Sequence, residues 1–183
     1  MSSRSGPGPY THVFIDESSR TTGKKRFQGY YLAAAVVPTP ALASARIVLR
    51  NGLRPGRTSF HFTKEQDVDR ARFLAAIADT GIVTRVYKSP NAKDAEARPS
   101  LLIQLLADLP ALRSVYLGLE QREEHQNKID RQLIAQHRAA SLQSYAHLPK
   151  AEPLLWVSDA IAWCCGHPDW HTKVRTMGLA ETA

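Results

Sequence analysis

The sequence predicts an α/β fold, a mixed five-stranded sheet with helices on both faces. Hydrophobic residues make up 43% of the 183 residues and charged residues 22%, which are the proportions of a globular protein. Apolar segments rich in β-branched and aromatic residues alternate with segments that have the apolar spacing of a helix. An order of strand, strand, helix, strand, helix, strand, helix, strand, helix, helix favours a mixed sheet.

The chain is expected to begin with a tail and to continue as one domain. Residues 1–10 are rich in Ser, Gly, Pro and Arg, which predicts a disordered N-terminal tail before a single domain over residues 11–175. Thr11–Ile15 and Gly29–Val37 are strand-like, and the turn residues Gly23-Lys24-Lys25 lie between them. These two strands are therefore predicted to form a hairpin.

Punctuating residues divide the next part of the chain into two helices and a strand. Pro38-Thr39-Pro40 stops the second strand and opens a helix over Ala41–Leu53. Ser59–Phe62 is a short strand candidate, and a second helix is predicted over Lys64–Asp79, with Gly81 as its C-cap signal.

The second half of the sequence predicts two further strands and three helices. Ile82–Tyr87 is strand-like, and a helix over Ser100–Leu109 ends before Pro110. Arg113–Leu119 is predicted as the last strand. A long helix over Glu124–Tyr145 and an apolar helix over Leu154–Cys165 complete the order.

The net charge of +7 is concentrated in the first part of the chain. Residues 1–57 carry nine Lys and Arg against two acidic residues, whereas the remaining residues carry fifteen of each sign. Such a basic region suits the backbone of a nucleic acid, and Lys24, Lys25 and Arg26 are predicted to grip it without sequence preference. The alternative is an ordinary solvated surface.

The cysteines and the apolar segments indicate a compartment. Cys164 and Cys165 are the only cysteines, and no basic-then-apolar leader follows Met1, which predicts a cytoplasmic protein. Leu154–Cys165 is far shorter than the ~20 residues that span a bilayer, so no membrane partner is expected. Zinc binding by the two cysteines with His167 and His171 is a weak alternative, because adjacent cysteines lack the Cys-x₂-Cys spacing.

Asp16 is the first candidate site residue. It follows the apolar strand residues Val13–Ile15, so its carboxylate can leave the core toward a cleft at the end of the sheet. Glu17 points to the opposite face if the strand continues, and we expect it not to share an ion with Asp16. An aspartate that caps local N–H groups at a turn is the alternative.

Asp159 is the second candidate, because it lies in a helix that is apolar nearly all round. An isolated ionised carboxylate in such a place costs several kcal/mol or is neutralised. Asp159 therefore needs a metal ion, an arginine or a hydrogen-bonding network as its partner. A pair with a buried arginine is the non-functional alternative.

Acidic residues after the last predicted strand supply further metal-ligand candidates. Glu120 ends that strand and Asp130 lies on the following helix. Convergent carboxylates are what Mg²⁺ or Mn²⁺ prefers, although most such acids are plain surface charges. His61, before the second helix, is either a general base or phosphate-orienting group, or a histidine at the edge of the core with a satisfied hydrogen bond.

Several of these segments together resemble a known family. They are Phe14–Ser18, the strand Gly29–Val37, His61-Phe62 and the apolar helix that bears Asp159, and they span roughly residues 11–166. In these pieces the chain resembles the domain of unknown function 3800, whose members look like ribonuclease H-type metal nucleases. It departs from that family at Ser19, where the family commonly has Gly, and at Trp156-Val157-Ser158 before Asp159, where Leu-Gln and a small residue are usual.

The resemblance implies a ribonuclease H-like fold and a set of roles. Asp16 would be the catalytic aspartate of the first strand and Asp159 the carboxylate of the last helix, with Glu120, or less directly Asp130, in the middle position. The predicted function is a metal-dependent nuclease, in which Asp16, Glu120 and Asp159 hold Mg²⁺ or Mn²⁺ and a metal-bound water attacks the phosphodiester of DNA or RNA. The alternatives are an inactive module of the same fold that binds nucleic acid or protein, and a subunit of a larger assembly.

Overall fold

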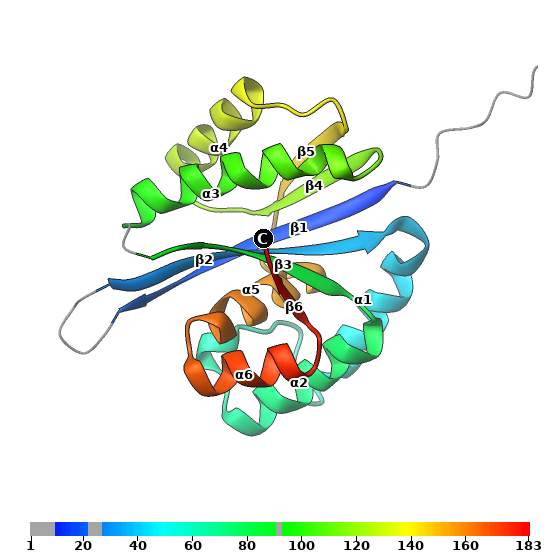
Figure 1. Ribbon diagram of the computed structural model, residues 1–183. Helices are drawn as coiled ribbons and strands as arrows, with labels where there is room; N and C mark the ends of the chain where they lie inside the picture. Colours follow the sequence, from blue (N-terminus) through cyan, green and yellow to red (C-terminus); the bar gives the residue numbers. More distant parts are fainter. Residues whose placement is uncertain (1–9, 22–26, 91–92) are drawn as a thin grey trace, which may run out of the picture.

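The computed structural model describes residues 10–21, 27–90 and 93–183, and its centre is a mixed β-sheet (Figure 1). The strand order is β5-β4-β1-β2-β3-β6. β2 is antiparallel to β1 and to β3, whereas β4 is parallel to β1, β5 to β4 and β6 to β3. The strands are β1 Thr11–Thr21, β2 Phe27–Pro38, β3 Val83–Ser89, β4 Val115–Glu120, β5 Leu142–Leu148 and β6 Ala180–Thr182. The predicted mixed sheet and its first hairpin are confirmed, but the sheet has six strands, not five.

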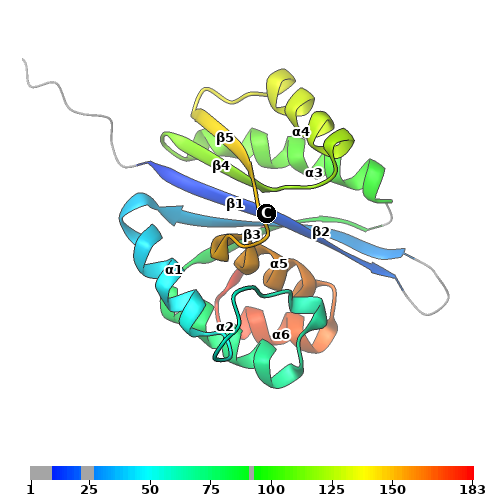
Figure 2. The same cartoon turned by 180° about the vertical axis from the view of Figure 1, so that it is seen from behind.

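Helices cover both faces of this sheet, as the sequence predicts. The helices are α1 Leu42–Asn51, α2 Asp67–Thr80, α3 Asp94–Asp108, α4 Glu124–Gln136, α5 Pro153–Cys165 and α6 Pro168–Thr176. α3 and α4 lie on one face, and α1, α2, α5 and α6 lie on the other (Figures 1 and 2). No helix in the described part of the chain is both long and apolar enough to cross a membrane.

Alternation along β1 divides the core into two halves. Phe14 packs into the core beneath α5, whereas Val13 and Ile15 pack into the core beneath α3. This follows from the strand geometry, in which successive side chains point to opposite faces. The side chain of Asp16 therefore leaves β1 on the α5 face of the sheet, and that of Glu17 leaves it on the α3 face.

A close approach between α5 and β1 brings the C-terminal part of the chain onto the first strand. The hydroxyl of Ser158 donates a hydrogen bond of 2.8 Å to the carbonyl of Phe14. Gly118 on β4 leaves room beside the Phe14 ring, because a Cβ atom there would lie 2.9 Å from Phe14 Cδ1 and 2.7 Å from Leu148 Cδ1. The packing places Asp159, one residue after Ser158, near Asp16, just beyond the point where β1 stops pairing with β4.

The strand predicted over Ser59–Phe62 is wrong. These residues form an irregular segment that ends in a short 3₁₀ turn over Phe62–Lys64, and α2 starts at Asp67, three residues later than predicted. The apolar character of the segment comes from aromatic packing. The Phe60 ring stacks on Phe73 with centroids 4.1 Å apart, and Phe62 lies 5.2 Å from Trp163.

The long helix predicted over Glu124–Tyr145 is also wrong. α4 ends at Gln136, and β5 then occupies Leu142–Leu148, so β4 is not the last strand. No large apolar residue occurs between residues 135 and 141, so a longer helix would have no apolar face to bury. This gap in the apolar pattern separates the end of α4 from the start of β5.

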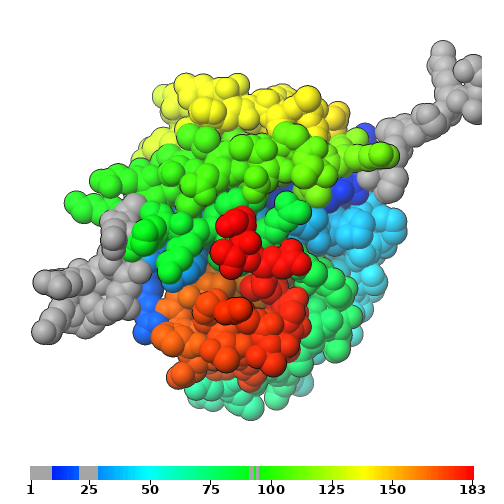
Figure 3. Space-filling model, in the orientation of Figure 1, coloured from blue at the N-terminus to red at the C-terminus, as the bar shows by residue number. Residues whose placement is uncertain are grey.

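Two other boundaries differ from the prediction. α3 begins at Asp94 instead of Ser100 and includes Pro99, whose ring nitrogen cannot donate a helical hydrogen bond. Regular structure also extends past residue 175, because β6 pairs with β3 and lies on the surface between α3 and α6 (Figure 3). Residues 1–9 of the predicted tail lie outside the described residues.

Candidate metal centre

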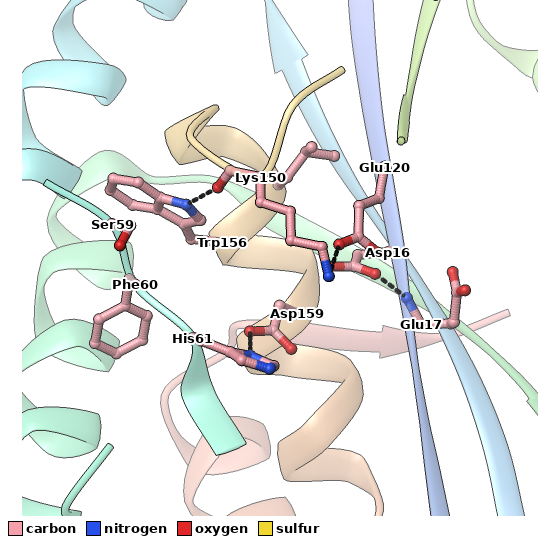
Figure 4. A pocket seen from close by; sticks show the side chains of 10 residues that line it. Asp16, Glu17, Ser59, Phe60, His61, Glu120, Lys150, Trp156 and Asp159 are labelled. Carbon is pink, nitrogen blue, oxygen red and sulfur yellow. Dashed lines mark hydrogen bonds and ion pairs between the residues drawn. The ribbon is translucent and has the colours of Figure 1, made fainter. Parts of the chain in front are cut away.

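A cavity of about 290 Å³ opens at the end of the sheet where β1 passes β4 (Figure 4). Its lining comes from β1, the segment before α2, the end of β4, the β5–α5 connection and α5. The lining residues are Asp16, Glu17, Ser59, Phe60, His61, Glu120, Lys150, Leu155, Trp156 and Asp159. The cavity therefore brings together the predicted site residues Asp16, His61, Glu120 and Asp159.

The parallel pairing of β1 and β4 explains why two of these acids meet. Ile15 is paired with Leu119, and each is followed by an acidic residue, Asp16 on β1 and Glu120 on β4. The carboxyl ends of parallel strands lie at the same edge of a sheet, where ligands commonly bind. Two carboxylates far apart in the sequence thus reach the same point.

Three carboxylates at this edge can bind a metal ion. One oxygen each from Asp16, Glu17 and Glu120 lie within 4.8 Å of one another. Glu17 Oε2 also pairs with Arg98, and Glu17 Oε1 lies 3.2 Å from Arg122 Nε. The expectation that Glu17 does not share an ion with Asp16 therefore stays a prediction. β1 has no β4 partner beyond Ile15, so side chains that start on opposite faces meet at the open edge.

The electrostatic environment of Asp16 favours the arrival of a cation. Burial raises its pKa well above the ordinary value of an aspartate, and the charges of Glu17, Glu120 and Asp159 raise it further. The backbone N–H of Glu17 donates a hydrogen bond of 2.7 Å to Asp16 Oδ1. A positive ion at the carboxylates would relieve the repulsion that holds this pKa high.

Asp159 has partners, as its apolar helix requires, but neither is an arginine. Its Oδ2 accepts a hydrogen bond of 2.9 Å from the backbone N–H of Phe62 and lies 3.3 Å from Nδ1 of His61. Asp159 lines the same cavity, but its oxygens are not among the three that lie within 4.8 Å of one another. It thus contributes its negative charge from α5 and holds His61 in place.

His61 has both a satisfied hydrogen bond and access to the cavity. The hydrogen bond to Asp159 raises the pKa of His61 above its ordinary value, while burial opposes that shift. Its side chain is 47% exposed, so the ring can exchange protons with solvent or with a bound ligand. The histidine is therefore placed for proton transfer at the mouth of the cavity.

Asp130 does not join these carboxylates. It is buried between α3 and α4, where Oδ1 accepts a 3.1 Å hydrogen bond from Arg98 Nε and Oδ2 accepts one of 2.8 Å from Arg98 Nη2. Nε2 of His147 lies 3.4 Å from the same Oδ2. Asp130 neither lines the cavity nor belongs to the cluster of three carboxylates, so the structure does not bring it to the other predicted metal ligands.

Lys150 is a site residue that the sequence analysis does not identify. Its Nζ lies 2.8 Å from Glu120 Oε1, and this hydrogen bond raises the pKa of Lys150 (Figure 4). The residue follows β5, at the same sheet edge as Glu120. Because the sequence reading placed residues 142–145 in a helix, it did not show that a strand ends directly before Lys150.

The other predicted binding groups are the basic residues of the first hairpin and the two cysteines. Lys24, Lys25 and Arg26 lie outside the described residues. Cys164 is buried and Cys165 partly buried, and burial raises the pKa of Cys165 to about 11. Within residues 10–21, 27–90 and 93–183, the one cluster of three or more potential metal ligands is the acidic one described above.

Comparison with known proteins adds no relative. No protein-family model matches the chain, and no curated protein sequence matches it. The resemblance to the domain of unknown function 3800 therefore stays a prediction.

Proposed function

We propose that the chain is a metal-dependent nuclease in which Asp16, Glu17 and Glu120 hold Mg²⁺ or Mn²⁺. The observation that carries the proposal is the convergence of three carboxylate oxygens within 4.8 Å in a cavity that also receives Asp159. Hard divalent ions take oxygen ligands and keep bound waters, which suits them to phosphate substrates. Such an ion supplies an activated water and stabilises charge on the leaving oxygen.

Charge supports a phosphodiester as the substrate. The cavity itself is acidic and repels phosphate, so a polyanion needs both a cation in the cavity and basic residues around it. The chain carries a net charge of +7 despite this acidic cavity. A nucleic-acid backbone, DNA or RNA, is the substrate class that combines these requirements.

The arrangement of the strands supports the family resemblance. Three strands joined as antiparallel neighbours, β1 to β3, are followed by two that run parallel to β1 on its other side, and the first strand is central. This is the order expected of a ribonuclease H-like fold, with β6 as an addition at the β3 edge. We therefore also propose that the chain has a ribonuclease H-like fold and belongs to the domain of unknown function 3800.

His61 and Asp159 act in proton transfer in this scheme. The Asp159 carboxylate orients the His61 ring, and the raised pKa keeps a larger fraction of the histidine protonated near neutral pH. A protonated His61 at the cavity mouth can give its proton to an oxygen that leaves phosphorus. In its neutral form it can take a proton from an attacking water.

The test is cleavage of labelled single-stranded, duplex and hybrid oligonucleotides with Mg²⁺ or Mn²⁺. Asp16→Asn and Glu120→Gln should each lower the rate by about 10²-fold or more, because residues that support metal ligands already cost about 10–100-fold when lost. The double variant should be hardly worse than either single one, since metal ligands act as a unit. Asp67→Asn is the matched control, because its carboxylate is 77% exposed at the start of α2.

Metal binding is measured on the same proteins by thermal unfolding. Mn²⁺ at about 100 times its Kd should stabilise wild type by about 2.7 kcal/mol, and Asp16→Asn should cancel that gain. Equal melting with EDTA and with Mn²⁺, together with no cleavage of any substrate, would contradict the nuclease. Binding without cleavage would instead favour the inactive binding module.

A further inference from the structure

Lys150 combines a fixed backbone with an exposed side chain at the mouth of the cavity. Its carbonyl oxygen accepts a hydrogen bond of 2.7 Å from the indole N–H of Trp156, a residue buried in α5. The N–H of Glu152 donates a 3.0 Å hydrogen bond to the carbonyl of Pro149 and closes the turn around it. The side chain, in contrast, is 75% exposed. The tip can therefore move while its base stays at the rim.

Lys150 also differs in charge from the other groups at the cavity. Among the described residues that line it, four are carboxylic acids and Lys150 is the one lysine or arginine. The two arginines near Glu17 start elsewhere, since Arg98 comes from α3 and Arg122 follows β4. A phosphate group in the cavity would thus meet Lys150 as its protein cation.

The present partner of Lys150 is weakly held. An ion pair with one highly exposed member contributes little to stability, because solvent screens the attraction and the long side chain loses freedom. A divalent ion at Asp16, Glu17 and Glu120 would offset the negative charge that attracts the ammonium group and would repel it. The lysine would then point its charge toward the open part of the same cavity.

We propose that Lys150 is a substrate-binding residue that exchanges Glu120 for a non-bridging phosphate oxygen of a phosphodiester. The proposal rests on the nuclease function proposed above and adds a residue that contacts the substrate directly. In the metal-free protein, Lys150 serves as the counter-charge of Glu120. In the loaded protein it fixes the phosphate against the acidic centre.

The variants are chosen to separate charge from length. Lys150→Met removes the charge and keeps a long side chain, whereas Lys150→Arg keeps the charge. Lys173→Met is the matched control, because Lys173 is exposed on α6, where its Nζ lies 5.0 Å from the centre of the Trp170 ring. Trp170 does not line the cavity.

The first readout is Mn²⁺ affinity, measured by calorimetry without nucleic acid. Lys150→Met should bind Mn²⁺ more tightly, by up to about fivefold, because the competing ammonium group is gone. Lys150→Arg and Lys173→Met should bind Mn²⁺ like wild type. Unchanged or weaker binding of Mn²⁺ by Lys150→Met would overturn the counter-charge role.

The second readout is kcat/KM on a labelled oligonucleotide. Lys150→Met should lose about tenfold to a hundredfold, the usual range for a hydrogen bond to a charged group, and Lys150→Arg should recover most of the loss. A methylphosphonate at the cleaved linkage removes one charged oxygen. The methylphosphonate should lower kcat/KM of wild type but lower that of Lys150→Met little further. The substitution and the methylphosphonate remove the same contact, so their effects should not add.

Two results would overturn this assignment. The first is a kcat/KM for Lys150→Met equal to that of Lys173→Met. The second is a methylphosphonate that lowers kcat/KM by the same factor in wild type and in Lys150→Met. If wild type cleaves nothing, the nuclease proposal fails separately, and the oligonucleotide is followed by fluorescence anisotropy with Mn²⁺. Weaker binding by Lys150→Met than by Lys173→Met would then support the phosphate contact, and equal binding would overturn it.

Discussion

The two faces of β1 hold acidic residues in opposite ways. On the α5 face, Asp16 lines a cavity together with Glu120 and Asp159. On the α3 face, Asp130 is buried and both of its oxygens accept hydrogen bonds from Arg98. Glu17 connects the two regions, because it pairs with Arg98 and also reaches the carboxylates of the cavity.

The difference separates an acid that is paired within the core from acids that converge in a cavity. A buried carboxylate paired with an arginine has its charge offset and is closed to ligands. Carboxylates that converge without enough positive charge repel one another, which is the pattern that perturbs pKa values at functional sites. Both faces hold buried aspartates, so the difference lies in their neighbours: Arg98 from α3 pairs with Asp130, whereas Asp16 lines a cavity with other carboxylates.

The largest expected effect comes from breaking the paired network. Arg98→Met should lower the free energy of unfolding by about 3–5 kcal/mol, because it leaves the buried Asp130 carboxylate without its partner. Urea denaturation measures the change. Arg131→Met is the control, since the ion pair of Arg131 with Glu124 is exposed and should contribute about 0–1 kcal/mol. Similar losses for both variants would show that the buried Arg98 pair contributes no more to stability than an exposed ion pair.

A smaller effect, of opposite sign, is expected in the cavity. Asp16 has a raised pKa in the folded protein, so the native state binds this proton more tightly than the unfolded chain does. Its contribution to stability is therefore present at low pH and is lost as pH rises from about 3.9, the unfolded value, through the folded pKa.

The substitution Asp16→Asn removes the ionisable group and with it the loss of stability as pH rises. In EDTA near pH 7 the variant should have a higher free energy of unfolding than wild type, and the difference should shrink as pH falls toward 4. Thermal or urea unfolding at several pH values measures it. A less stable Asp16→Asn at neutral pH would show that the cavity, like the α3 face, holds its acid in a favourable pair.

The smallest effect concerns His61. Its folded pKa is raised by Asp159, so its contribution to stability is fully present below about pH 6.5 and is lost as pH rises through the folded pKa. His61→Gln should cost a few tenths of a kcal/mol near pH 5.5 and nothing at pH 9, a small value because the side chain is half exposed. A cost for His61→Gln that is the same at both pH values would contradict the pair.

The sequence predicts best those elements that are bounded by proline or glycine and have a regular apolar pattern. The hairpin, α1 and the end of α2 at Gly81 follow from Pro, Gly and a clear apolar period, and the apolar α5 differs from its predicted range by one residue. β5 was not predicted, because Leu142–Leu148 lies at the edge of the sheet and buries only Leu142 completely. An edge strand with little burial leaves a weak pattern in the sequence.

The candidate site was predictable where a carboxylate ends a strand. Asp16 and Glu120 each directly follow an apolar strand segment, and Asp159 stands out as the acid in an apolar helix. The roles of Asp130, Glu17 and Lys150 depend instead on tertiary neighbours: Arg98 from α3, the open edge beyond Ile15, and the end of β5. No local pattern encodes these neighbours.

The hydrogen bond from Ser158 to Phe14 spans 144 residues, which sets an order of events during synthesis. β1 emerges from the ribosome before α5, the helix that covers its Phe14 face. At about 5–20 residues per second, the apolar face of the first hairpin waits roughly 7–30 s for α5. During that interval the face lacks its covering helix, and the cavity is incomplete until α5 has been synthesised.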